Sequence, residues 1–184
     1  MHEVRIHGRG GQGAVTSAEL LALAAIAEGG YAQAFPSFGP ERRGAPVIAY
    51  ARVSEKRIRL RSAIQQPTVV VVLDPSLLKL VKVDQGIQKN GWIILNTAKK
   101  LDEIRSTFKF EANLALVDAN RIAKEEIGRV IANTTMLGAL ISAVPMVSIQ
   151  HLEQALEERF GRLAAKNITA FRRAQKDAVI WKIS

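Results

Sequence analysis

The sequence contains no cysteine among its 184 residues. This absence excludes disulfides, thiolate zinc sites, cysteine-ligated iron–sulfur clusters and a cysteine nucleophile. Only three histidines occur, His2, His7 and His151, and their spacing matches no metal-binding motif. We therefore predict no metal ligand in this chain and expect the histidines to be one terminal surface residue and two structural residues.

Long apolar runs are also missing, since the run at 20–27 is far shorter than the roughly 20 residues that span a bilayer. The first residues predict a strand and not a signal peptide, so we expect a cytoplasmic protein without a membrane partner. Internal repeats and linkers rich in proline and serine do not occur. The length and the 48% hydrophobic content predict one globular domain covering residues 1–184.

Hydrophobic patterning predicts an α/β fold in which strands alternate with helices. The run TVVVVL at 68–73 is typical of a strand covered on both faces. Residues 47–53 and 57–61 alternate about Ser54-Glu55-Lys56 and predict a hairpin, which makes the sheet mixed. Further strands are expected at 3–7, 31–35, 92–96 and 114–118, and helices at 14–28, 134–143, 149–160 and 166–181.

Carboxylates and hydroxyls at element boundaries are better explained as helix caps than as catalytic groups. Asp74 and Asp118 follow predicted strands, and Ser148 precedes a predicted helix. Their side-chain oxygens are suited to accept hydrogen bonds from free backbone N–H groups. Because no nucleophile–base pair or carboxylate pair can be assembled, we predict no catalytic residue in this chain.

A glycine-rich segment between the first predicted strand and helix is the first candidate site. Its residues fit the spacing G-x-G-x-x-G: Gly8, Arg9, Gly10, Gly11, Gln12 and Gly13. Such a loop lets main-chain N–H groups and a helix dipole face an anion. A dinucleotide site also needs an acid after the second strand, but that strand ends Ala34-Phe35-Pro36. Close helix–strand packing, another phosphate-bearing ligand and a partner's surface remain open as explanations.

Arginines form the second candidate site. Seven basic residues but only one acid, Glu55, lie between positions 42 and 61, in a chain of net charge +9. Arg42 and Arg43 lie in a loop at 36–46 that contains three prolines, where guanidinium groups are suited to bind a phosphate or carboxylate. Three of the other basic residues predict a solvated strand face that deters edge pairing: Arg57, Arg59 and Arg61.

The positive charge also permits a nucleic-acid-binding protein, a function of a different class. The best patch for it is the C-terminal helix with Arg172, Arg173 and Lys176. Aromatic residues make up only 5% of the chain and fall mostly in apolar patterns, so bases have few stacking partners. We therefore expect no nucleic-acid partner, and the missing ribose acid likewise argues against a stand-alone nucleotide-binding reductase.

Three segments together resemble the gamma subunits of the pyruvate:ferredoxin oxidoreductase family, also called pyruvate synthases. They are HGRGGQGAVTSAELLA, YAQAFPSFGPERRGAPVIAYARV and IRLRS. The later segments VVVVLDPSLL, WIILNT and NTTMLGAL agree with the family, so the resemblance covers most of the chain. Pyruvate members resemble the E-R-R-G-A-P version, whereas relatives acting on 2-oxoglutarate, 2-oxoisovalerate or indolepyruvate have altered loops. Thr135 departs from the pattern by standing where many relatives have proline.

The resemblance implies one subunit of a complex that converts pyruvate and coenzyme A to acetyl-CoA and CO2, reversibly, with electrons passing to ferredoxin in anaerobic metabolism. Its partners would be alpha, beta and delta subunits. Those chains would hold thiamine diphosphate with Mg and the iron–sulfur clusters, so this chain alone would bind none of these cofactors and be inactive alone. The implied fold is a single α/β domain with a curled, mixed sheet flanked by helices, the domain III type of the family. The glycine loop with Arg42 and Arg43 would border a site for the phosphates of coenzyme A, or dock the thiamine-binding chains.

Overall fold

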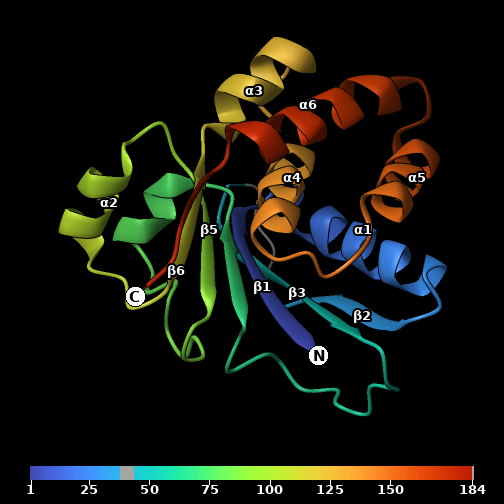
Figure 1. The fold of residues 1–184 in the computed structure, drawn as a ribbon, viewed down its shortest axis with the longest axis horizontal. Coiled ribbons are helices and arrows are strands. Elements are labelled where there is room, and N and C mark those ends of the chain that lie inside the picture. Colours follow the sequence, from blue (N-terminus) through green and yellow to red (C-terminus); the bar gives the residue numbers. More distant parts are fainter. Residues whose placement is uncertain (38–43, 184) are drawn as a thin grey trace.

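A mixed β-sheet runs through the molecule, with helices on both of its faces (Figure 1). The computed structural model describes residues 1–37 and 44–183. Within them the strands are β1 (His2–Arg9), β2 (Tyr31–Pro36), β3 (Pro46–Ser54), β4 (Val69–Val72), β5 (Trp92–Asn96), β6 (Asn113–Val117) and β7 (Val179–Trp181). The helices are α1 (Ala14–Ala27), η1 (Pro75–Lys79), α2 (Leu101–Phe108), α3 (Ala119–Glu126), α4 (Asn133–Ala143), α5 (Ile149–Phe160), η2 (Gly161–Leu163) and α6 (Ala164–Asp177).

The strand order is β2-β3-β1-β4-β5-β6-β7. Neighbours from β1 through β4 and β5 to β6 are parallel, whereas β2, β3 and β7 join by antiparallel pairing. The predicted α/β class with a mixed sheet is therefore confirmed. No helix among residues 1–37 and 44–183 has the length and apolar content that a bilayer crossing requires.

Alternating side chains of the parallel strands feed two separate cores. Val69 and Val71 of β4 pack with α1, α4, α5 and α6, whereas Val70 and Val72 pack with α2 on the opposite face. All four side chains are buried. The prediction that 68–73 forms a strand covered on both faces is confirmed, because helices cover both sides of it (Figure 1).

Predicted caps occupy three element boundaries. The carboxylate of Asp74 accepts from the backbone N–H of Ser76 at the start of η1, and Asp118 caps α3 in the same way. The hydroxyl of Ser148 caps α5. At the other end of α1, Gly29 has a left-handed φ of 82°, as the predicted glycine stop requires.

Three details differ from the sequence-based expectation. Residues 57–61 form no strand, so the predicted hairpin is wrong, and the antiparallel partner of β3 is β1 on one side and β2 on the other. The last helix ends at Asp177 and the chain continues as β7, because the β-branched run after it pairs with β6. The run 20–27 of α1 is apolar throughout, which favours burial on all sides, yet Leu23 and Ile26 are 47% and 55% exposed.

Candidate functional site

The glycine loop, residues 8–13, lies at a switch point of the sheet. The connections that follow the neighbouring parallel strands β1 and β4 run to opposite faces of the sheet there. After β1 the chain enters α1 on one face of the sheet, whereas after β4 it enters η1, which packs with α2 on the other face (Figure 1). A crevice outside the carboxyl ends of parallel strands opens at such a switch point, and ligands of open α/β sheets bind there. The sequence-predicted glycine loop thus occupies the place in the fold where a ligand is expected.

Asp74, at the end of β4, ties the glycine loop together. Its Oδ2 accepts from Nε of Arg9 and from Nε2 of Gln12, both at 3.0 Å, while Oδ1 accepts from the backbone and hydroxyl of Ser76. Burial opposes ionisation of Asp74, but the hydrogen bonds from Ser76 and Gln12 and the charge of Arg9 outweigh it and lower the pKa of the carboxyl. Asp74 is therefore ionised at neutral pH, and Arg9 neutralises it.

Each of the three nitrogens of the Arg9 guanidinium donates one hydrogen bond within the chain. Besides Asp74, it donates to the carbonyl of Gly44 at 3.0 Å and to the hydroxyl of Ser76 at 2.8 Å. Gln12 also turns inward, since its Oε1 accepts from the backbone N–H of Arg9. The two polar side chains predicted as site residues therefore shape the loop, and Asp74 and Ser76 are the partners that the sequence did not reveal.

Different physical reasons explain why the individual positions of the loop are occupied by glycine. A side chain at Gly13, which has a φ of 82°, would come within 2.6 Å of Nδ2 of Asn133 at the start of α4. A Cβ at Gly8 would contact Leu73 at 3.2 Å. Gly10 instead pairs through its backbone with Ala45. Gly11 has a φ of 93° and no described atom within 4 Å of its added Cβ, so it faces open space.

Helix α1 begins at this loop without a side-chain cap. Gly13 is its N-cap residue and offers no side chain, and the first turn contains no acid. The first-turn N–H groups and the helix dipole therefore present a positive end. A pocket of about 200 Å³ lies next to it. Its lining residues are Gln12, Leu73, Asp74, Pro75, Ser76, Asn120, Val130 and Ala132.

Arg42 and Arg43, the other predicted site residues, lie outside the described residues. The chain that follows them is held directly against the glycine loop. The N–H of Gly10 donates to the carbonyl of Ala45 at 3.0 Å, and the N–H of Gly44 donates to the carbonyl of Gly10 at 3.3 Å. The structure thus brings the end of the arginine loop to the glycine loop.

A buried cation beside the glycine loop was not expected from the sequence. Arg5 is 8% exposed and its Nε donates to Nε2 of His7 at 3.1 Å. Its NH2 donates to the carbonyls of Val83 and Gln85 at 2.9 and 2.6 Å. Burial, and then the charge of Arg5, lower the pKa of His7 to about 4. His7 is therefore neutral and accepts from Arg5, so this pair is a structural element of β1.

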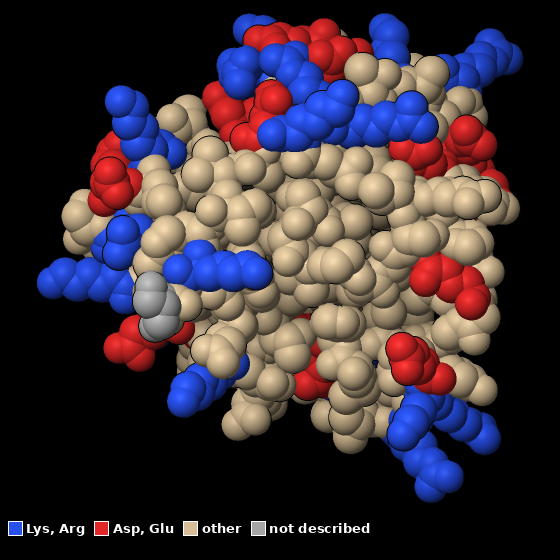
Figure 2. Space-filling view, viewed as in Figure 1, with Lys and Arg blue, Asp and Glu red and all other residues tan. Residues whose placement is uncertain are grey.

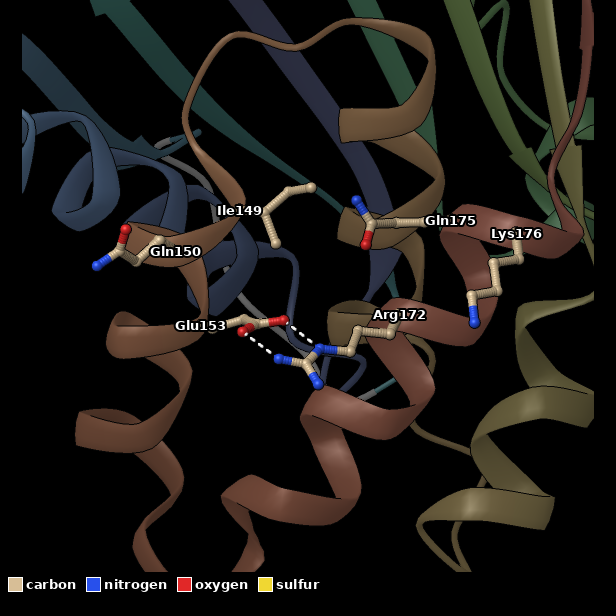
Figure 3. A pocket seen from close by; sticks show the side chains of 6 residues that line it. All are labelled: Ile149, Gln150, Glu153, Arg172, Gln175 and Lys176. Carbon is tan, nitrogen blue, oxygen red and sulfur yellow. Dashed lines mark hydrogen bonds and ion pairs between the residues drawn. The ribbon is translucent and has the colours of Figure 1, made fainter.

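The C-terminal helix offers little free positive charge for nucleic acid. Figure 2 shows that basic and acidic side chains intermingle over α3 and α6, above an uncharged central face. Arg173 contacts Glu125 and Glu126 at 2.7 and 2.6 Å. In the pocket between α5 and α6, Arg172 donates to both carboxylate oxygens of Glu153, at 2.6 and 2.7 Å (Figure 3). Most of the predicted basic patch is thus already paired.

We find no candidate metal site in the part of the chain that the structure describes. No group of three or more histidine, aspartate or glutamate side chains there is arranged to hold a metal ion. The candidate site is therefore an uncapped helix start at a sheet switch point, reinforced by the partly buried ion pair of Arg9 and Asp74. Its chemistry is the recognition of an anionic group or of another protein.

Comparisons with known proteins agree with this geometry. The family model described as pyruvate ferredoxin/flavodoxin oxidoreductase matches residues 3–176. The chain is 50% identical over 185 residues to the pyruvate/ketoisovalerate oxidoreductases common subunit gamma of Thermococcus litoralis, covering 100% of both chains. It is 48% identical to a pyruvate synthase subunit of Methanothermobacter marburgensis, covering 94% of each. A pyruvate oxidoreductase subunit of Thermotoga maritima has the same fold, with a TM-score of 0.87, 36% identity and 97% coverage of both chains.

Fold and loop together define an α/β protein built around a glycine-rich helix start, and the chain belongs to the pyruvate ferredoxin/flavodoxin oxidoreductase family. Within that family it is a gamma subunit of a 2-oxoacid:ferredoxin oxidoreductase, a complex of several subunits. The resemblance found in the sequence is confirmed.

Proposed function

We propose that this chain, as one gamma-type domain over residues 1–184, serves a complex that oxidises pyruvate. The complex would use coenzyme A, form acetyl-CoA and CO2, and pass electrons to ferredoxin. The observation that supports pyruvate is that the relatives at 50% and 48% identity both carry pyruvate in their names. The E-R-R-G-A-P segment, residues 41–46, agrees with the pyruvate members of the family.

Substrate competition in the purified complex tests this proposal. The measurement is kcat/KM for pyruvate, 2-oxoisovalerate and 2-oxoglutarate at saturating coenzyme A, with ferredoxin reduction as the readout. We expect pyruvate to exceed both alternatives at least about tenfold, which corresponds to about 1.4 kcal/mol in transition-state binding. A preference for 2-oxoglutarate would overturn the assignment.

A second candidate has its own support, because the Thermococcus litoralis relative is named as a subunit common to pyruvate and ketoisovalerate oxidoreductases. In that case one gamma chain would serve two sets of catalytic sister chains. Affinity purification of the tagged chain from its native cells separates the two candidates. One set of sister chains supports a dedicated pyruvate subunit, and two sets, each active on a different 2-oxoacid, support a shared one.

The sister chains are proposed to be alpha, beta and delta subunits that hold thiamine diphosphate with Mg and the iron–sulfur clusters. This chain has no cysteine to ligate a cluster. Its own contribution is therefore binding and assembly, and we expect the isolated chain to be inactive. Turnover of a 2-oxoacid by the isolated chain would contradict this division of labour.

At the candidate site, the glycine loop and Arg42 with Arg43 are proposed to bind the phosphates of coenzyme A. Coenzyme A supplies the thiol that receives the acyl group. The residues here would hold its anionic end through the first-turn N–H groups of α1 and the two guanidiniums. The uncapped start of α1 fits such a ligand. Arg9 contributes through loop shape, because its charge is already balanced by Asp74.

Replacing both arginines by alanine in the assembled complex separates ligand binding from docking. A raised KM for coenzyme A with unchanged KM for pyruvate supports the ligand role. Loss of sister chains on purification supports docking instead. The matched control is Lys89→Ala with Lys182→Ala, which removes two exposed charges at the opposite end of the sheet from the glycine loop. Full activity with unchanged KM for coenzyme A in the arginine variant would discard both roles.

A further inference from the structure

The segment 56–61, here called the basic segment, is one feature that the candidate site does not use. Its sequence is KRIRLR, and all residues except Ile58 are exposed. It belongs to the connection from the end of β3 to the start of β4, so it lies at the opposite end of the sheet from the glycine loop (Figure 1). A role for it is therefore independent of the anion site.

The alternation of this segment predicts a strand, yet no strand among residues 1–37 and 44–183 pairs with it. Among the described residues, no hydrogen bond uses the backbone groups of 57–61. In an extended chain the three arginines point to one side, and Ile58 and Leu60 to the other. Leu60 is 49% exposed. An unpaired extended segment with an apolar side chain in water is a template for strand addition.

Both ends of the basic segment are anchored. Arg52, which is 1% exposed, donates to the carbonyl of Ser62 at 2.8 Å, and Ile64 is buried. At the other end, the backbone N–H of Lys56 donates to the hydroxyl of Ser54, the last residue of β3, at 3.1 Å. The anchors hold the segment at a fixed place on the surface, which reduces the entropy lost when a partner binds it.

Charge selects the chemistry of that partner. Lys56, Arg57, Arg59 and Arg61 form no ion pair with any described residue, whereas the arginines of α6 at 172 and 173 are paired. A partner with acidic side chains would satisfy them, and its apolar residues would cover Leu60. Nucleic acid would neutralise the arginines but leave Leu60 in water, and the segment has no aromatic residue for stacking.

We propose that residues 56–61 dock this chain to a sister subunit of the complex by pairing as an added strand with an acidic sheet edge. The backbone groups would supply affinity, and the arginines would select the edge by charge. Membership in a multi-subunit complex, which the family establishes, supplies the occupant. The proposal does not depend on which 2-oxoacid the complex uses.

Hydrogen exchange of the intact, assembled complex tests the pairing without any substitution. The amides at 57–61 have no acceptor among the described residues, so protection that is present in the complex and absent from the isolated chain would come from another chain. We expect alternate amides of the segment to exchange at least about tenfold more slowly than an unstructured peptide. Exchange at the unprotected rate throughout 57–61 would overturn the proposal.

Charge reversal tests the docking role. The variant Arg57→Glu with Arg59→Glu and Arg61→Glu is compared with a control that reverses the same number of exposed charges elsewhere: Arg162→Glu, Lys166→Glu and Lys176→Glu. Sister chains retained by the tagged chain should fall at least about tenfold in the first variant and stay near wild type in the control. Full retention in the first variant, or equal loss in both, contradicts the proposal. Lost binding to duplex DNA or anionic vesicles with assembly intact would assign the segment to those ligands instead.

Discussion

The buried imidazole of His7 should make the stability of this chain depend on pH. His7 is 5% exposed and accepts from the Arg5 guanidinium, so a proton on it would place two cations in contact. Burial and Arg5 lower the pKa of His7 from 6.5 to about 4. The imidazole of His7 therefore takes up a proton near pH 6.5 in the unfolded chain, but only near pH 4 in the folded chain.

The sign and the size follow from linkage. Above pH 6.5 both states carry a neutral imidazole and His7 does not affect stability. As the pH falls from there toward 4, protonation favours the unfolded state and stability is lost. Between about pH 7.5 and about pH 5 the free energy of unfolding should fall by about 2 kcal/mol through His7 alone.

Urea unfolding of the purified chain at these two pH values measures the effect. The variant His7→Gln keeps a carbonyl oxygen that can accept from Arg5 but does not titrate, so it should lose about 2 kcal/mol less than wild type. The control variant is His151→Gln, which removes a histidine at the start of α5 and leaves the contact between His7 and Arg5 in place. If wild type and His7→Gln lose the same stability, the folded protein accommodates the charged imidazole and the reasoning fails.

Further substitutions test the packing around the site. Gly138→Ala would bring its Cβ within 2.1 Å of a backbone oxygen of α6, so overpacking should outweigh the better helix propensity and lower the free energy of unfolding by about 2 kcal/mol. Asp74→Asn presents an amide to donors, and should cost about 2 kcal/mol in urea unfolding, whereas an unchanged value would mean that the loop is held otherwise. Gly13→Ala and Gly11→Ala both strain a left-handed residue by about 1–2 kcal/mol, but only the former also meets Asn133, so its melting temperature should be lower.

The features that the sequence predicted correctly are those determined by interactions between residues close together in the chain. The continuous β-branched run of β4 and the caps at Asp74, Asp118 and Ser148 depend on neighbours within a few residues, and all were found as expected. The run 57–61 shows the limit of such reasoning. Its alternation is equally regular, but a strand exists only where another strand pairs with it, and that partner is not encoded locally.

The burial of the polar side chains of Arg5 and His7 could not be predicted either, because it depends on a segment distant in sequence. The alternation in β1 places Val4 and Ile6 on one face, in the core, but does not show what surrounds Arg5 and His7 on the other face. The second face of β1 is closed by the segment around residues 83–85, whose carbonyls accept from Arg5 across 78 to 80 positions of sequence. A contact over that separation follows from the assembled fold and leaves no trace in local periodicity.

At the candidate site, close packing, one of the three explanations that the sequence left open for the glycines, is compatible with a binding role. Packing accounts for Gly8 and Gly13, whose missing side chains admit Leu73 and Asn133. Gly11 needs a different reason, because it faces open space in a left-handed conformation. Tight packing on both sides of Gly11, with the inward Arg9–Asp74 pair, fixes the main chain at the start of α1. A fixed, uncapped helix start loses little entropy when an anion or a partner binds. The packing role therefore prepares the binding role, and removing Gly13 should weaken both together.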